Sequence, residues 1–293
     1  MAYLLKNKNI EIDIDAPLEN YQFSRFDWTG KIAEVKFKGV EVSTDERITN
    51  QKDASFGKGF YNEFGIDSAL GFDEAEIGGW FHKIGVGTLK KEGSKYLFSR
   101  NYKIKPAEFK LNNELNRVLI ECIGPLVNGY SYQLKKIIEI TENGFTINYR
   151  LQNTGEKEII TDEYTHNFLG INNALISNDH QLKFPFELQP KLFDETVNPE
   201  QKVTIGKTNI QFQGTPKEPF FFSNLTGGES EDASWTLVNR KSKIGVRETG
   251  DFKTSKVNLW GCEHVISPEL FYKIKLKAGE ATSWSRIFTF FKI

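Results

Sequence analysis

Residues 134–152, LKKIIEITENGFTINYRLQ, indicate the class of fold. Apolar residues alternate with polar ones on both sides of Asn143-Gly144, and a period of two is that of a half-buried β-strand. Asn-Gly supplies the backbone geometry of a tight hairpin turn. The stretch therefore predicts an antiparallel hairpin. A second turn at residues 153–156 predicts another hairpin, which returns through residues 158–164.

The same alternation continues towards both ends of the chain. We expect further strands at residues 10–15, 33–37, 80–89, 95–105, 117–123, 182–188 and 272–276. Pro185 suggests that the strand at 182–188 is an edge strand. In the final strand Trp284, Phe288 and Phe290 fall on one face. Helical periodicity is nearly absent and no linker divides the chain, so we predict one all-β domain over residues 1–293, a large antiparallel β-sandwich.

Two stretches break this pattern. Residues 53–77 are rich in glycine and aromatic residues, and we expect a long loop with at most a short helix. Residues 190–235 are rich in Pro, Gly, Asn and Glu and are the least regular part of the sequence.

Charge and motifs exclude several function classes. The 293 residues hold 38 Lys+Arg against 39 Asp+Glu, a net charge of -1, which argues against nucleic-acid or membrane partners. Nucleotide-binding glycine motifs, a nucleophile elbow and zinc-ligand spacing are missing, so we expect no metal and no cofactor. Cys122 and Cys262 are expected to be free thiols, and with no signal-peptide pattern we expect a cytoplasmic protein.

Residues 161–172, TDEYTHNFLGIN, hold one of only four histidines in the chain. Read as a strand, this stretch places Tyr164, His166 and Phe168 on one face. An imidazole is the side chain best suited to proton transfer near neutral pH. His166 is therefore a candidate catalytic residue, with a satisfied core histidine as the alternative interpretation.

A second stretch, residues 258–271, reads NLWGCEHVISPELF. As a single strand it places Cys262 and His264 on one face and Glu263 on the other, so these three cannot jointly bind one metal. The thiol and His264 suit the core, which leaves Glu263 facing a cleft or the solvent. A plain surface carboxylate is the alternative for Glu263.

The order of these stretches resembles the aldose 1-epimerase (galactose mutarotase-like) superfamily. In that resemblance a mid-chain strand with His166 is followed by a late glutamate, Ala278-Gly279-Glu280 and a final aromatic strand. The motifs SRFDWTG at 24–30, YNEFG at 61–65 and KIGVG at 83–87 are similar to a bacterial aldose 1-epimerase-like branch. The resemblance covers almost the whole chain. It implies a β-supersandwich with a sugar site in the concave face of one sheet.

The resemblance also implies residue roles. His166 matches the general acid and Glu263 the general base of an aldose 1-epimerase. Lys83 falls where the family has a substrate-binding arginine, and lysine cannot make the two-pronged contact of a guanidinium. His82 is near the position of an assisting histidine, but strand alternation turns it away from Lys83. The family's hydroxyl-binding aspartate has no clear match.

The chemistry requires such a pair in any case, because opening a pyranose removes the anomeric hydroxyl proton while the ring oxygen is protonated. Further candidates for sugar contacts lie in loops and strands around the pair. Arg25 and Asp27 share a face, where an ion pair is an equal alternative. The substrate-binding candidates are Lys83, Arg25, Asn62, Glu63 and Trp80, with Trp260 as a second stacking platform.

Three functions remain open at this point. The first is an aldose 1-epimerase that interconverts the anomers of a free monosaccharide. The second is the same reaction on a hexose 6-phosphate, for which Lys83, Arg25 and Arg247 would have to build a basic pocket. The third is a non-catalytic carbohydrate-binding protein on the same scaffold.

Overall fold

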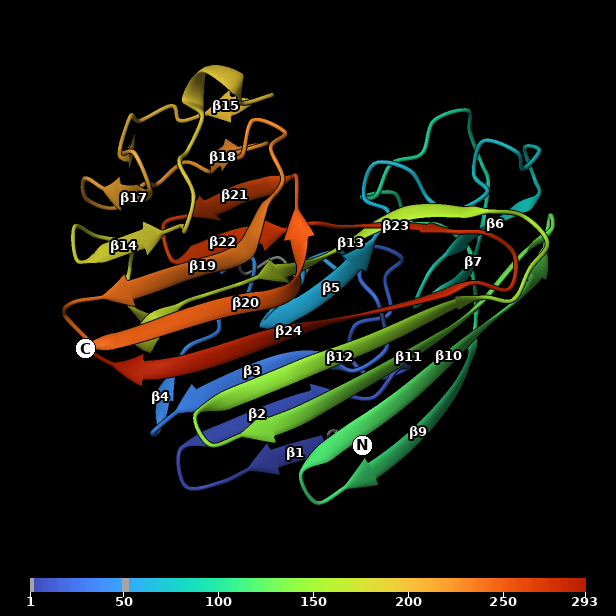
Figure 1. Cartoon of the computed structure of the whole chain (residues 1–293), viewed down its shortest axis with the longest axis horizontal. Coiled ribbons are helices and arrows are strands. Elements are labelled where there is room, and N and C mark those ends of the chain that lie inside the picture. Colours follow the sequence, from blue (N-terminus) through green and yellow to red (C-terminus); the bar gives the residue numbers. More distant parts are fainter. Residues whose placement is uncertain (1–2, 49–52) are drawn as a thin grey trace.

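A computed structural model describes residues 3–48 and 53–293, and two large antiparallel sheets dominate it (Figure 1). The larger sheet has ten strands in the order β16-β17-β14-β19-β20-β24-β12-β11-β10-β9. Their bounds are β9 Glu108–Glu114, β10 Arg117–Val127, β11 Tyr130–Thr141, β12 Gly144–Asn153, β14 His180–Lys183, β16 Val203–Ile205, β17 Asn209–Phe212, β19 Glu231–Asn239, β20 Ile244–Thr254 and β24 Ala281–Lys292.

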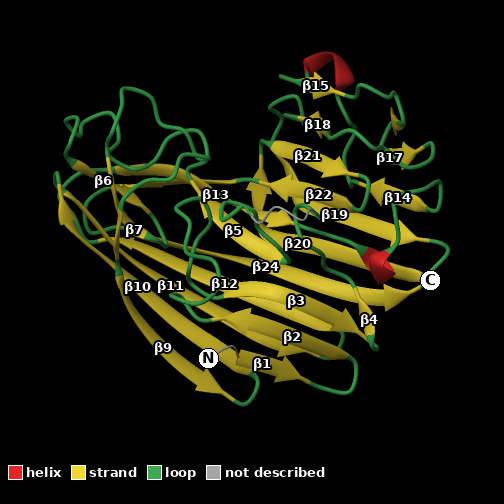
Figure 2. Ribbon diagram, turned by 180° about the vertical axis from the view of Figure 1, so that it is seen from behind, coloured by secondary structure: helices red, strands yellow, loops and turns green. Residues whose placement is uncertain are grey.

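The second sheet has seven strands in the order β1-β2-β3-β5-β13-β23, with β4 paired to β3. Their bounds are β1 Tyr3–Lys6, β2 Ile10–Asp15, β3 Lys31–Phe37, β4 Val40–Glu41, β5 Phe60–Phe64, β13 Ile159–Asn167 and β23 Tyr272–Leu276. The predicted all-β sandwich is confirmed. Figure 2 shows that the helices drawn are two short turns, η1 Ile171–Asn173 and η2 Pro190–Leu192.

The inner faces of the two large sheets share one apolar core. Alternate residues of β2, such as Ile12 and Ile14, are fully buried, as are Val118, Ile120 and Ile138 of the ten-stranded sheet. Burying side chains of this size is worth about 1.5–3 kcal/mol each. The hydrophobic alternation read from the sequence is therefore what selects the face of each strand that enters the core.

Two smaller sheets extend this sandwich. One contains β15 Thr196–Val197, β18 Phe220–Phe222, β21 Val257–Cys262 and β22 Val265–Leu270, and the other contains β6 Trp80–Lys83, β7 Gly87–Lys90 and β8 Ile104–Pro106. A bridge between Leu169 and Ile266 joins β22 to the chain just after β13. This junction brings two sequence-distant segments together. Among the described residues no helix is long and apolar enough to cross a membrane.

The predicted hairpin at residues 134–152 forms as β11 and β12, with Thr141 opposite Gly144. The second predicted hairpin does not form. The free edge of β12 is taken by β24, so the chain crosses to the other sheet and β13 pairs with β5 and β23.

Other boundaries also differ from the expectation. β5 lies inside residues 53–77, where a loop is expected from the sequence. All five of its residues are buried, so the sequence there shows no alternation that would indicate a strand. The strand expected at 80–89 is the hairpin β6–β7, and only residues 104 and 105 of the stretch 95–105 belong to a strand, β8. Pro185 lies beyond β14, which pairs with both β17 and β19 and is not an edge strand.

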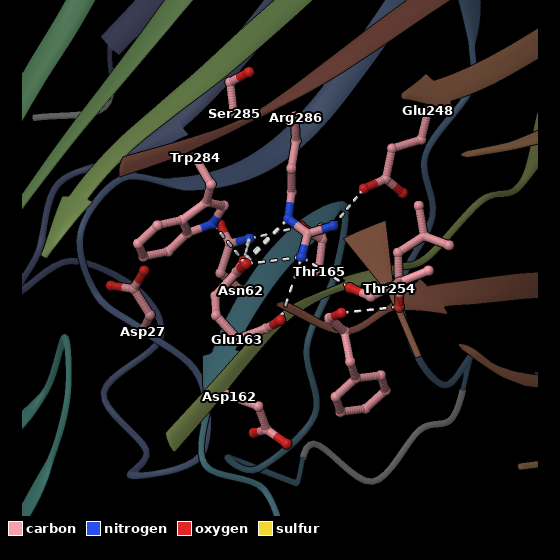
Figure 3. Close-up of polar contacts among 12 residues, drawn as sticks. Asp27, Asn62, Asp162, Glu163, Thr165, Glu248, Thr254, Trp284, Ser285 and Arg286 are labelled. Carbon is pink, nitrogen blue, oxygen red and sulfur yellow. Dashed lines mark hydrogen bonds and ion pairs between the residues drawn. The ribbon is translucent and has the colours of Figure 1, made fainter. Parts of the chain in front are cut away.

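A buried ionic cluster connects the two large sheets (Figure 3). Arg286 of β24 donates to Glu163 of β13 at 2.7 Å and to Glu248 of β20 at 2.6 Å, and all three side chains are fully buried. Trp284 donates to Glu163 at 2.9 Å. Asn167 donates to Glu248 at 3.0 Å and to the carbonyl of Pro268 at 2.6 Å, which fixes β13 against β22.

Candidate active site

A cavity of about 490 Å³ opens where the end of β13 meets β21 and β22. That volume is within the range of small-molecule sites. Its aromatic walls are Phe98, Tyr164, Phe221 and Trp260. Its charged or polar lining is made by Arg25, Glu46, Arg47, Asp67, His166, Asp194, Glu195, Ser223, Lys256, Asn258 and Glu269.

His166 has a partner at each ring nitrogen. Its Nε2 is 3.3 Å from Oε1 of Glu269, and its Nδ1 is 2.6 Å from Oγ of Ser267. The imidazole stacks on Phe168 with ring centroids 4.1 Å apart and makes a T-shaped contact with Trp260 with centroids 5.4 Å apart. These four contacts hold the ring in one orientation at the wall of the cavity.

β22 positions both partners of His166. Ser267 and Glu269 are two residues apart, so they share a face of the strand. Both are buried, with exposed fractions of 0% and 4%. The carbonyl between them, that of Pro268, accepts the hydrogen bond of Asn167, the neighbour of His166 on β13. The two strands are thus fixed to each other at the position of the pair.

Burial sets the charges of this pair. It raises the pKa of Glu269 to about 8; Arg25 lowers this pKa and Glu63 raises it further. Burial lowers the pKa of His166 well below its usual value, and the positive charge of Arg25 acts in the same direction. At neutral pH the pair therefore holds one proton, which lies on Glu269.

Arg25 is the predicted substrate-binding residue that lies at the cavity wall. Its Nη1 is 3.1 Å from Glu46 and its Nε is 3.3 Å from Glu63. Tyr164 also donates to Glu63, at 2.7 Å. The guanidinium is therefore held in place by two carboxylates. The ion pair with Asp27, the alternative considered for Arg25, does not form, because residues 21–30 are irregular and Asp27 pairs with Lys136 at 3.3 Å.

The other predicted binding residues lie outside the cavity lining. Lys83 is buried behind the wall, with Nζ 3.0 Å from Glu63 and 2.9 Å from the hydroxyl of Tyr96. Glu63 is fully buried between Arg25 and Lys83. The structure does not bring Lys83 or Glu63 to the cavity surface.

Two further candidates also lie elsewhere. Asn62 donates to Glu163 at 3.0 Å and accepts from Lys136 at 2.5 Å, in the polar cluster between the sheets. Trp80 belongs to β6, and the ammonium of Lys105 lies 4.0 Å from its ring centroid. By contrast, the second stacking candidate, Trp260, lines the cavity.

Glu263 is not brought to His166. β21 ends at Cys262 and β22 begins at Val265, so Glu263 and His264 form the turn of a hairpin and strand alternation does not apply to them. Glu263 lines a separate hollow beside Arg47 and Lys217. Cys262 and His264 are both buried, as expected, and Cys122 and Cys262 are both free thiols.

Glu269 and Ser267 were missed because the stretch 258–271 was read as one strand. A hairpin reading makes the apolar run VISPEL a buried strand in which Glu269 is the lone acidic residue. An ionisable group in such a run is unusual and indicates function. That signal was present in the sequence. The contact between Glu269 and His166 forms only in the folded chain, and no local sequence pattern indicates it.

Three kinds of comparison bear on the chain. No family model matches it, and no curated protein matches it. Solved structures do match. An aldose 1-epimerase candidate from Escherichia coli K12 superposes with a TM-score of 0.65 at 9% identity, over 100% of this chain and 99% of that one.

Two further structures have the same fold. A galactose mutarotase related enzyme from Lactobacillus acidophilus gives a TM-score of 0.62 at 14% identity, over 100% of this chain and 98% of that one. A galactose mutarotase-like protein from Lactobacillus casei gives a TM-score of 0.59 at 12% identity, over 99% of this chain and 100% of that one. The chain has the galactose mutarotase-like fold. The expected supersandwich is thereby confirmed, while at these identities the residue roles rest on the geometry of this chain alone.

Proposed function

We propose that the protein is an aldose 1-epimerase, with His166 and Glu269 as its acid-base pair. The observation that carries the proposal is the 3.3 Å contact between His166 Nε2 and Glu269 Oε1 at the wall of a sugar-sized cavity. Glu269 takes the place that the sequence assigned to Glu263. A cytoplasmic location remains part of the proposal, in line with the free thiols of Cys122 and Cys262.

The reaction needs one proton donor and one proton acceptor close together, because the anomeric oxygen and the ring oxygen are bonded to the same carbon. Of His166 and Glu269, one group takes the anomeric proton while the other protonates the ring oxygen, and the ring opens to the aldehyde. Rotation beside the aldehyde and closure on the other face reverse both transfers. The pair ends with the single proton with which it began.

The cavity lining favours a neutral sugar. Besides Glu269, which carries the proton of the pair at neutral pH, four acidic side chains line the cavity, and two of its three permanent cations are already paired: Arg25 with Glu46, and Lys256 with Asp67 at 2.9 Å. The third, Arg47, lies over the ring of Trp260, 5.2 Å from its centroid. A phosphate group would meet net negative charge here. Carboxylates and aromatic faces are instead the groups that bind sugar hydroxyls and C–H faces.

Polarimetry of freshly dissolved α-anomers of free hexoses and pentoses tests the proposal. We expect the wild type to accelerate relaxation of at least one aldose and His166→Ala to lose about 10²–10⁴-fold of that rate. His180→Ala is the matched control, because His180 is a buried histidine that bonds Asn239 outside the cavity. Sugar binding without acceleration by the wild type would contradict the proposal and identify a non-catalytic carbohydrate-binding protein.

A further inference from the structure

The two partners of His166 differ in chemistry. Glu269, at Nε2, can give up or take a proton, whereas Ser267, at Nδ1, is a hydroxyl that keeps its proton at neutral pH. The mechanism described above uses Nε2 and Glu269. It assigns no role to Ser267, although this residue makes the shorter of the two contacts to the imidazole.

We propose that Ser267 is a positioning residue: its Oγ accepts the Nδ1–H hydrogen bond of His166 throughout the reaction, so that Nε2 alone exchanges protons. This inference rests on the proposed function. A neutral imidazole has one donor and one acceptor nitrogen, and the bond made by one nitrogen decides the state of the other. Keeping Nδ1–H in both the neutral and the protonated ring leaves a single proton-exchanging atom facing Glu269.

The geometry fits this role. The Oγ–Nδ1 distance is 2.6 Å and Ser267 is fully buried, so water does not compete for Nδ1 at this position. Ser267 is held in β22 opposite Trp260 of β21, and the ring of Trp260 makes a T-shaped contact with the imidazole. The strand pair therefore fixes the main chain at Ser267, which holds its Oγ beside Nδ1.

The state of Glu269 supports the same tautomer. Because burial raises the pKa of Glu269 to about 8, its carboxyl can donate to Nε2 at neutral pH, which favours the Nδ1–H tautomer alongside the bond to Ser267 without enforcing it alone. Nδ1 then carries the hydrogen and donates it to Ser267. A carboxylate at Nδ1 would stabilise the imidazolium and make it a weaker acid, whereas a hydroxyl orients the ring without adding charge.

Replacing Ser267 removes none of the other titratable groups near His166 and Glu269. They come from several elements: Arg25 and Glu46 from two loops, Glu63 from β5, Tyr164 from β13 and Lys256 from the segment before β21. A change in the titration of the pair in a Ser267 variant therefore reports on the lost hydrogen bond.

Imidazole ¹⁵N NMR of the whole chain tests the proposal. The signals of His166 are identified among those of the four histidines by their loss in His166→Ala. In the wild type at pH 7 without sugar we expect a protonated Nδ1 and an unprotonated Nε2. Ser267→Ala should shift the population towards Nε2–H, and Ser267→Thr, which keeps the hydroxyl, should restore Nδ1–H.

Kinetics provide the second readout. Ser267→Ala should lower kcat by about 10- to 100-fold, less than loss of an acid-base group, with KM little changed. Ser131→Ala, which removes a serine hydroxyl bonded to Gly124 outside the site, is the matched control. If Ser267→Thr does not fold, Ser267→Cys replaces it, and because sulfur is a weak acceptor the shift should then be partial.

The tautomer separates failure of this inference from failure of the proposed function, because it is measured without a sugar. A wild-type His166 that carries its proton on Nε2 would overturn the role of Ser267 even if mutarotation is found. So would a Ser267→Ala protein that keeps both the wild-type tautomer and the wild-type kcat.

Discussion

His166 and Glu269 owe their charge states to the same physical cause. Each is nearly fully buried, and burial disfavours the charged form of both groups. An imidazolium facing a carboxylate and a neutral imidazole facing a carboxylic acid contain the same number of protons. The buried site favours the neutral arrangement, and the proposed reaction requires only that one proton remain in the pair.

The rate of mutarotation should therefore fall at high pH. The pair loses its proton as the pH rises through the pKa of Glu269 at about 8, and kcat/KM should then decrease about tenfold per pH unit. On the acid side a second proton binds only well below the usual histidine pKa, so the rate should rise about twofold from pH 8 to pH 7 and then stay level to below 6.5.

Mutarotation rates between pH 5 and 10, corrected for the hydroxide-catalysed background, check this profile. A rate that keeps rising between pH 8 and 9 after correction would show that the proton of Glu269 is not needed.

Individual residues also show which parts of the site could be predicted from the sequence and which could not. His166 and Arg25 could be selected because a lone histidine between aromatics and an arginine in a family motif carry local signals. Glu269 could not be paired with His166, since they are 103 positions apart by number and meet through a strand contact that no local pattern encodes. Lys83 and Glu63 satisfy each other in the interior, and sequence alone does not separate a buried pair from a binding pair.

At the scale of elements, β13 carries both the site and its support. His166 faces the cavity, while Glu163 and Asn167 on the same strand join the cluster around Arg286. Asn167 continues that cluster to β22 through Pro268. The ionic cluster between the sheets is therefore connected by hydrogen bonds to both strands that carry His166 and Glu269.

Arg286→Met should destabilise the protein by about 3–5 kcal/mol, because it leaves Glu163 and Glu248 buried without their cation. Denaturant unfolding measures the free energy. The matched control is Arg117→Met, which removes an exposed pair with Glu114 and should have little effect. Equal stabilities of the two variants would contradict a structural role for the cluster.

Hairpins with a local turn signal could be predicted at this scale, as β11 and β12 were. Partners of β13 could not, because the choice between β12 and β5 depends on β24, which occupies the edge of β12 from the far end of the chain. β5 was missed for another reason: a strand buried on both faces shows no alternation.

At the scale of the molecule, the fold class followed from alternation along nearly every strand, and the large sheets confirm it. The single domain over residues 1–293 remains a prediction. What no local pattern contains is the junction of β13 with β21 and β22, which makes the cavity. Its charge is likewise a property of the assembled chain, since among its acidic residues only Asp194 and Glu195 are neighbours in the sequence.

That charge predicts substrate preference. Free aldoses should be turned over with a higher kcat/KM than their 6-phosphates, because the cations Arg25 and Lys256 are already paired with carboxylates. Anomer exchange followed by NMR compares glucose with glucose 6-phosphate in one buffer. Faster exchange of the phosphate would indicate that the cavity binds an anion and would contradict the predicted preference.

The most direct test of the account is the rate of mutarotation of Glu269→Gln beside that of Glu263→Gln, measured by polarimetry on the aldose that the wild type accelerates most. Both changes replace a carboxyl by an amide of the same shape, and only Glu269 contacts His166. We predict a loss of about 10²–10⁴-fold for Glu269→Gln and a near wild-type rate for Glu263→Gln. A normal rate in Glu269→Gln together with a lost rate in Glu263→Gln would contradict the assigned pair.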